Sequence, residues 1–168
     1  MVGCVSHPAI QDKVVAYYCG VISTSSPDGR IPFNKTEVTM MREIRDGGRE
    51  IVETRTEPGI SPSMPPHTTT LRLTRRAETL VYDASDEKGL PCGIIRFGNQ
   101  QLNVWTYALN IQSAENCSGK GKLTEKGILV SKETTGARPM LVTEELHAVS
   151  RSEYDQTLSA FRPPHGAE

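Results

Sequence analysis

The segment REIRDGGREIVETR, residues 42–55, reads almost symmetrically about Gly47 and Gly48 and constrains the fold more than any other stretch of the chain. Glycine tolerates positive φ angles, so we expect two antiparallel strands joined by a two-residue turn of type I′ or II′. The register that this turn implies pairs side chains of complementary kind: Ile44 with Ile51, Arg42 with Glu53, and Arg45 with Glu50. Charge and hydrophobicity therefore agree on one pairing.

Neither face of this hairpin is wholly apolar. Val38, Met40, Arg42 and Ile44 share one face, and Met41, Glu43 and Val52 share the other. Such strands pass from core to solvent, or turn one face towards a partly polar cavity. Arg42, Glu43, Glu53 and Arg55 cluster on this hairpin, and in a cavity a buried Arg would be a natural counter-ion for a ligand carboxylate. The alternative is that the charged residues are solvated cross-strand partners, each contributing little to stability.

Strand and turn patterns continue along most of the chain. The segment TTLRLTRRAETLVYD predicts a hairpin that turns at Arg76-Ala77 and pairs Leu73 with Leu80 and Leu71 with Tyr82. The segment QLNVWTYALNIQS is apolar on both faces and predicts a central strand. From residue 14 to residue 149, turn signals recur every 8 to 12 residues or so, which is typical of all-β domains.

We therefore predict an all-β fold: a single up-and-down antiparallel β-barrel, or a strongly curved meander, of about nine or ten strands. Closing the meander into a barrel removes its two unpaired edges. The chain of 168 residues suits one domain over 1–168, with strands in about 14–149. The stretch 57–67 holds four prolines, but a boundary there would leave halves too small for a core, so we interpret it as a loop.

A helix signal appears only near the end of the chain. In SRSEYDQTLSAF, Ser150 and Glu153 have the spacing of a capping box, and Tyr154, Leu158 and Phe161 recur at helical spacing. This predicts a short helix at about 151–161, packed against the sheet or across a barrel end. The tail 162–168 is expected to fray.

Composition narrows the choice of partners. Lys and Arg total 19 against 20 Asp and Glu, and the net charge of −1 offers no general attraction to nucleic acid or to an anionic membrane. No run of about 18 apolar residues and no export signal is visible, so we expect a cytoplasmic protein, or a periplasmic one if a signal segment was removed. The cysteines, which we expect to be mostly buried free thiols, are Cys4, Cys19, Cys92 and Cys117.

The chain resembles the bacterial lipocalin-like, or calycin-like, families of uncharacterised function. The resemblance is carried by YYCGVISTSSPDGR, by the first hairpin, by VWTYALNIQS, and by GKLTEKGILVSKETTGARPMLVTEELHAVSRSEYDQTL with its strand, turn, strand and helix. It implies a calycin-like barrel that binds a small apolar ligand. It implies no particular catalytic residues.

A ligand pocket in such a barrel would draw on aromatic, thioether and guanidinium side chains, because these bury much area and adapt in shape. The candidate ligand-binding residues are Met40, Arg42, Phe97, Trp105 and Tyr107. The apolar members of this set could equally be ordinary core residues, since the chain has only nine aromatic residues.

Candidates for acid-base chemistry are weaker. Glu145 and His147 lie two apart on one strand, where a carboxylate beside an imidazole could transfer protons, and Glu43 and Glu53 lie on the first hairpin. Ordinary solvent-facing residues are the competing interpretation. No metal-binding or cofactor-binding motif is present, so we expect neither metal nor cofactor.

Three function hypotheses follow. The leading one is non-enzymatic binding of a small, mainly apolar or amphipathic ligand inside the barrel, with the helix as a cap. The first alternative is a cyclase, isomerase or lyase that uses the same cavity with an acid-base Glu or His, since one fold hosts both kinds of function. The second is a structural or interaction protein with a solid barrel. The sequence does not indicate the oligomeric state.

Overall fold

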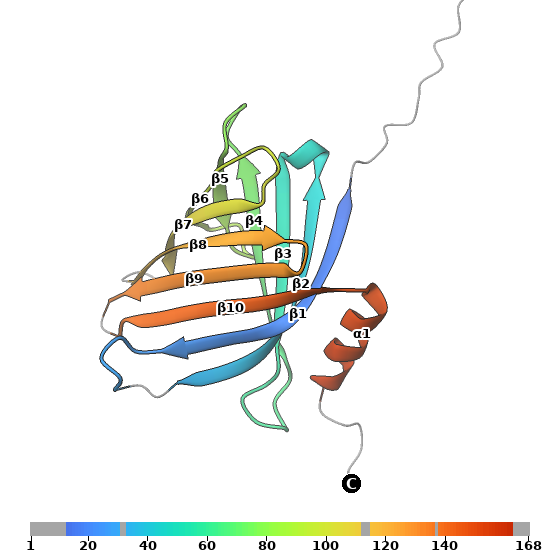
Figure 1. The fold of residues 1–168 in the computed structure, drawn as a ribbon, viewed down its shortest axis with the longest axis vertical. Helices are drawn as coiled ribbons and strands as arrows, with labels where there is room; N and C mark the ends of the chain where they lie inside the picture. The colour runs from blue at the N-terminus through green and yellow to red at the C-terminus, as the bar shows by residue number, and fades with distance from the viewer. Residues whose placement is uncertain (1–12, 31–32, 112–114, 137, 163–168) are drawn as a thin grey trace, which may run out of the picture.

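The computed structural model describes residues 13–30, 33–111, 115–136 and 138–162, which form ten strands and one helix in all-antiparallel order (Figure 1). The elements are β1 (Val14–Ser25), β2 (Asn34–Arg45), β3 (Glu50–Glu57), β4 (His67–Arg75), β5 (Val81–Ser85), β6 (Pro91–Phe97), β7 (Val104–Ile111), β8 (Glu115–Thr124), β9 (Gly127–Thr135), β10 (Met140–Val149) and α1 (Arg151–Ala160). The expected all-β meander with a short terminal helix is confirmed.

The meander closes into a barrel because β1 pairs with both β2 and β10. Every strand therefore has two hydrogen-bonded neighbours, and no sheet edge is left open. In Figure 1, β8, β9 and β10 cross in front of β2, β3 and β4 at a large angle, so the barrel is flattened into two layers. This architecture is consistent with a calycin-like fold.

The first hairpin has the predicted register but a different turn. Ile44 pairs with Ile51 and Arg42 pairs with Glu53, as the charge pattern indicates. The connection is a 3₁₀ turn over Asp46–Gly48, followed by Arg49, and not a two-residue turn. Asp46, Gly47 and Gly48 all have positive φ, at 52°, 61° and 90°, so the glycines are needed for a wider loop than expected.

The prediction for the second hairpin is wrong by four residues. Leu73 pairs with Ala84, and Arg75 pairs with Tyr82. The loop between the strands is longer because Ala77 adopts a positive φ of 44°. An ion pair with three hydrogen bonds from Arg76 to Asp83 joins the two sides of its base. Because the slip is even, Leu73 and Tyr82 still face the barrel interior, where both are buried.

The C-terminal helix has the predicted start but not the predicted role as a cap. The Ser150 hydroxyl accepts a hydrogen bond from the Glu153 amide at 3.1 Å, as in a capping box. The helix packs on the outer face of β1 and β2, where the rings of Tyr154 and Tyr17 lie 5.0 Å apart. It therefore packs against the sheet, one of the two expected placements, and covers neither barrel end. The tail beyond Arg162 lies outside the described residues.

The barrel core is densest towards one end, which we call the plugged end. Leu102, in the connection between β6 and β7, is buried there at a positive φ of 56°. The Tyr82 hydroxyl donates a buried hydrogen bond to the Gly48 carbonyl, which joins β5 to the first hairpin turn. Ile51, Leu73, Ile128 and Leu146 are all almost completely buried nearby.

Candidate functional site

The five candidate ligand-binding residues all lie inside the barrel. Alternation along each strand directs their side chains inward, and each is at most 5% exposed. They come from three strands: Met40 and Arg42 from β2, Phe97 from β6, and Trp105 and Tyr107 from β7. The structure thus brings together in one interior the residues that the sequence indicates as a group. Their role in binding stays a prediction.

Arg42 lies in an aromatic cradle. Its guanidinium carbon is 5.3 Å from the centre of the Trp105 ring and 5.9 Å from that of Phe97, within the range of cation–π attraction. A carboxylate oxygen of Glu53 lies 3.7 Å from Nε, too far for a hydrogen bond. Among the described residues, Nε of Arg42 has no hydrogen-bond partner although it is buried.

An ion pair crosses the barrel interior. Arg55 on β3 donates two hydrogen bonds to Glu144 on β10, one of them from Nη2 to Oε2 at 3.0 Å. These strands are not neighbours in the barrel, so the pair spans the space between opposite walls. Glu53 lies 3.9 Å from Arg55, and Lys132 on β9 lies 3.7 Å from Glu144. The two carboxylates and their basic neighbours form one connected cluster.

The interior cluster has more basic groups than acidic ones. Arg42, Arg55 and Lys132 share Glu53 and Glu144, so full ionisation leaves one surplus positive charge. Burial, together with the nearby Arg55 guanidinium, lowers the pKa of Lys132 to about 7. Its ammonium lies 4.8 Å from the centre of the Tyr107 ring. Near neutral pH, the cluster therefore exchanges one proton at Lys132.

The tyrosines around the cluster stay protonated over the physiological pH range. Burial and, to a smaller extent, the Glu53 carboxylate raise the pKa of Tyr107 to about 12. Burial also raises the pKa of Tyr18, whose side chain points inward from β1. Both phenols can therefore donate hydrogen bonds, but neither is poised as a base at neutral pH.

Between the cluster and the end opposite the plug, the inward side chains are only partly buried. Lys132 and Arg55 retain 15% and 19% exposure, in contrast to the 2% of Glu144. The partly buried apolar residues packed against the core on this side include Ile22, Leu71 and Cys92. We call this the open end of the barrel.

Of the four acid-base candidates, only Glu53 faces the interior. Glu43 lies on the outer face beside Arg45 and Lys13, and their hydrogen bonds outweigh the effect of partial burial, so the pKa of Glu43 is lowered. Glu145 and His147 share one strand face, as expected, but that face is the exposed outside of β10. A barrel-interior site therefore cannot use Glu43, Glu145 or His147.

Sequence reasoning missed two interior residues, Lys132 and Glu144. A period-two reading finds both: Glu144 lies between the inward Val142 and Leu146, and Lys132 follows the inward Val130. Charged residues at inward positions break the usual pattern of a strand facing a core. That break in the pattern was the available sequence signal for Lys132 and Glu144, whereas the prediction chose Glu145 and His147.

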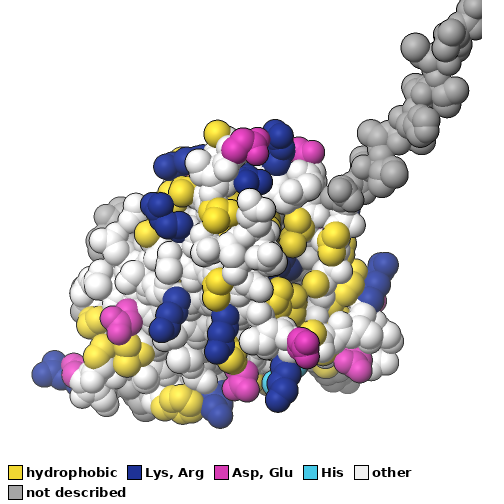
Figure 2. Space-filling view, turned by 45° about the horizontal axis from the view of Figure 1, so that its top comes forward, with side chains coloured by type: hydrophobic (Ala, Val, Ile, Leu, Met, Phe, Trp, Pro, Cys, Tyr) yellow, Lys and Arg dark blue, Asp and Glu magenta, His cyan; other side chains and the backbone are white. Residues whose placement is uncertain are grey.

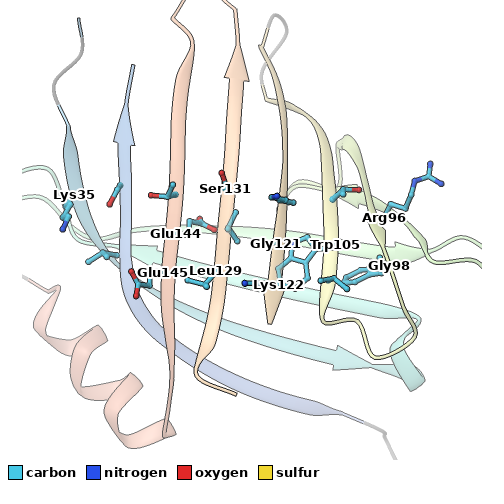
Figure 3. A pocket seen from close by; sticks show the side chains of 18 residues that line it. Lys35, Arg96, Gly98, Trp105, Gly121, Lys122, Leu129, Ser131, Glu144 and Glu145 are labelled. Atoms are coloured by element: carbon cyan, nitrogen blue, oxygen red, sulfur yellow. The ribbon is translucent and has the colours of Figure 1, made fainter. Parts of the chain in front are cut away.

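A second feature lies on the outer surface. A groove of about 730 Å³ crosses the outside of the sheet from β2 to β6 by way of β1, β10, β9, β8 and β7. Figure 3 shows Lys35 and Arg96 at its opposite ends, with Leu129 and Lys122 between them. Lys and Arg side chains are also interspersed with apolar side chains on the face shown in Figure 2.

The cysteines of the described residues form no disulfide. Cys19, Cys92 and Cys117 are free thiols, and Cys4 lies outside the described residues. Within the described chain, no group of three or more His, Cys, Asp or Glu side chains is placed to hold a metal ion. The same part of the chain contains no helix that is long and apolar enough to cross a membrane.

No family model matches this chain, and neither a curated protein nor a solved structure matches it significantly.

Proposed function

We propose that this protein binds a small, mainly apolar molecule carrying a carboxylate or similar anionic group inside its barrel, without transforming it. The observation that carries the proposal is the surplus of buried positive charge that the cluster has when Lys132 is protonated. Three basic side chains share two carboxylates, and the buried Nε of Arg42 donates no hydrogen bond to any described residue. A ligand anion would balance this charge and could accept that hydrogen bond.

Stability alone does not account for such a cluster. Desolvating charged groups costs free energy, and well-packed apolar residues of similar volume are often equally stabilising or more so. A surplus charge adds to that cost because it has no internal partner. An anion held by Arg42 would balance the surplus charge, so the protein would bind anionic ligands in preference to neutral ones. The resemblance to lipocalin-like families also supports a binding role.

The apolar part of the ligand would lie towards the open end. The side chains of Ile22, Leu71 and Cys92 are partly buried there and pack against the core, so the apolar part of the ligand would have to insert among them. At the inner limit of the site, Trp105 and Phe97 pack against Arg42, so the anionic head would sit beside aromatic rings. This is the usual composition of a ligand site: an apolar wall with a few polar groups that fix orientation.

Fluorescence of Trp105 tests the proposal directly, because it is the only tryptophan in the chain. We expect decanoate to change the Trp105 emission saturably, and decanol, which has the same chain length without the charge, to bind at least about tenfold more weakly. Arg42→Gln should remove most of the preference for decanoate. The matched control Arg96→Gln, on the outer face, should retain it.

Equal responses to decanoate and decanol would contradict the role of the charge cluster. No saturable response to either probe, from a protein with wild-type thermal unfolding, would contradict interior binding altogether. Native mass spectrometry before and after organic extraction would also show whether a ligand co-purifies.

One observation favours an enzyme as the second candidate function. Lys132 is an inward-facing base with a pKa of about 7, and it lies 3.7 Å from the carboxylate of Glu144. A neutral amine in a mostly apolar site can abstract a proton near neutral pH. The enzyme hypothesis therefore moves from the predicted Glu and His residues to Lys132, with Glu53 as the only earlier candidate still inside the barrel.

Ring opening of 5-nitrobenzisoxazole tests this candidate, because the reaction needs only one proton abstraction. An enzyme of this kind should accelerate the reaction with a rate that rises through about pH 7, and Lys132→Met should abolish the acceleration. Lys126→Met, in an exposed turn, is the matched control. An equal rate for wild type and Lys132→Met would exclude Lys132 as the base.

A further inference from the structure

The outer groove contains a row of side chains that runs straight across seven strands. Each member pairs in register with the next, so the row follows the hydrogen-bonding direction of the sheet. We call it the hydroxyl row; its members are Lys35, Ser23, Thr143, Ser131, Lys120, Thr106 and Arg96. All seven line the groove.

The hydroxyl row offers polar groups that the described protein does not use. None of its four hydroxyl side chains makes a hydrogen bond to another described residue, and none of its three basic side chains has a carboxylate within ion-pair distance in the described chain. Lys35 makes only a long contact with the Phe33 ring, at 5.5 Å. The row thus has three unpaired positive charges and no acidic residue.

A second row lies beside the first, two residues along each strand, and it is more apolar. We call it the apolar row; its members in the groove are Val21, Glu145, Leu129, Lys122, Val104 and Gly98. Val104, the first residue of β7, and Leu129, in β9, are each 41% exposed, so both offer apolar surface to a partner. The groove therefore has one cationic, hydroxyl-rich side and one side that presents three apolar side chains together with the oppositely charged Glu145 and Lys122.

These two rows fit an extended peptide better than other polyanions. Nucleic acids and sulfated sugars carry no apolar side chains for Leu129 and Val104. The two aromatic residues that line the groove, Phe97 and Trp105, are at most 5% exposed, so they offer little ring surface on which bases or sugars could stack. An extended peptide directs alternate side chains to opposite sides, so acidic residues could face one row and apolar residues the other. The free hydroxyls could hydrogen-bond to the backbone of the peptide. A peptide cannot pair with a strand edge here, because the barrel is closed.

The spacing of the charges also suits such a peptide. Strands lie about 4.8 Å apart, so Lys120 is about 19 Å and Arg96 about 29 Å from Lys35 along the row. In an extended chain, every second residue advances about 6.7 Å, which places acidic side chains at about 0, 20 and 27 Å. About nine residues cover the whole row.

We propose that this groove binds an extended acidic segment of another protein, in which acidic residues alternate with apolar ones. The acidic side chains pair with Lys35, Lys120 and Arg96, and the apolar side chains contact Leu129 and Val104. This surface is on the opposite side of the barrel wall from the interior cluster. The two proposals are tested with different probes and different variants, so either can fail without the other.

Fluorescence anisotropy with a fluorescein-labelled peptide of sequence ELELELELE tests the proposal on the full chain. We expect saturable binding, and Lys120→Ser and Leu129→Ser should each weaken it about tenfold or more. Lys126→Ser, in an exposed turn outside the groove, is the matched control and should change affinity less than about twofold. The peptide ESESESESE, with the same charge but no leucine, should bind about tenfold more weakly.

Unchanged thermal unfolding of each variant would show that the fold is retained. Two results would overturn the proposal. The first is no saturable binding of ELELELELE at up to about 1 mM. The second is equal affinity for ESESESESE together with an unaffected Leu129→Ser variant, which would identify the groove as a general polyanion surface.

Discussion

Arg55 and Glu144 join opposite walls of the barrel through two hydrogen bonds, although they lie on strands that are not neighbours. Glu144 is almost completely buried, and Arg55 is mostly buried. A pair in this position ties β3 to β10 by side chains alone. It also divides the densely packed plugged end from the looser open end.

Removing one partner of this pair should be far more damaging than removing both. We expect Arg55→Met to lower the free energy of unfolding by about 3 to 5 kcal/mol, because it leaves a buried carboxylate with less compensation. The double variant Arg55→Met/Glu144→Met should recover much of that loss. Urea denaturation of the wild type, both single variants and the double variant measures the coupling. Additive losses would show that the two side chains do not interact.

Lys132 should make stability depend on pH in a defined direction. Its pKa is about 7 in the fold and near the ordinary 10.5 in the unfolded chain. Between these values the unfolded chain binds the proton and the folded chain does not, so the free energy of unfolding rises with pH. We expect wild type to gain stability relative to Lys132→Met as pH increases from about 7 to about 10. Thermal unfolding of both proteins across this range measures the difference, and parallel curves would contradict the assignment.

Gly121 should not tolerate a larger residue. A Cβ added there would lie 2.6 Å from Cζ2 of Trp105, and a buried ring of that size cannot move without disturbing Phe97 and Tyr107. We expect Gly121→Ala to destabilise the fold by about 1 to 3 kcal/mol and to shift the Trp105 emission. Gly29→Ala, at an exposed turn with no atom near the added Cβ, controls for glycine replacement, although its positive φ adds a backbone cost.

Ser150→Ala should loosen the helix without opening the barrel. The Ser150 hydroxyl accepts the hydrogen bond from the Glu153 amide, so its loss should reduce stability by about 1 kcal/mol. Ser150→Asp should restore most of this loss, because aspartate is also a good N-cap. Far-ultraviolet circular dichroism together with urea denaturation distinguishes the three proteins. Equal stability of all three would mean that α1 contributes nothing to the fold.

The barrel could be predicted from the sequence because most strands show an alternation of apolar and polar residues and most turns contain residues that favour turns. The pairing of Arg42 with Glu53 followed from complementary charges on both sides of Gly47 and Gly48. The β4–β5 register did not follow, because Arg76-Ala77 resembles a tight turn and nothing local shows that Ala77 adopts a positive φ.

The candidate sites were harder to predict from the sequence, because they are formed by strands that are distant from one another along the chain. The pair of Arg55 with Glu144 joins residues 89 positions apart, which no local pattern connects. The groove likewise needs the register of seven strands at once. The sequence contained one sign of the groove, because Val104 makes β7 apolar on its outer face. We interpreted this pattern as that of a central strand, whereas Val104 is 41% exposed in the groove.

An even number of strands has a consequence for how the barrel can be tethered. β1 begins and β10 ends beside the plugged end, where Tyr17 pairs with Val149. The loops over 58–66 and 86–90 lie at the opposite, open end. An attachment made just before β1 would therefore hold the molecule with its open end directed away from the anchoring surface. For the same reason, immobilisation through that side should leave the open end of the barrel exposed to solvent.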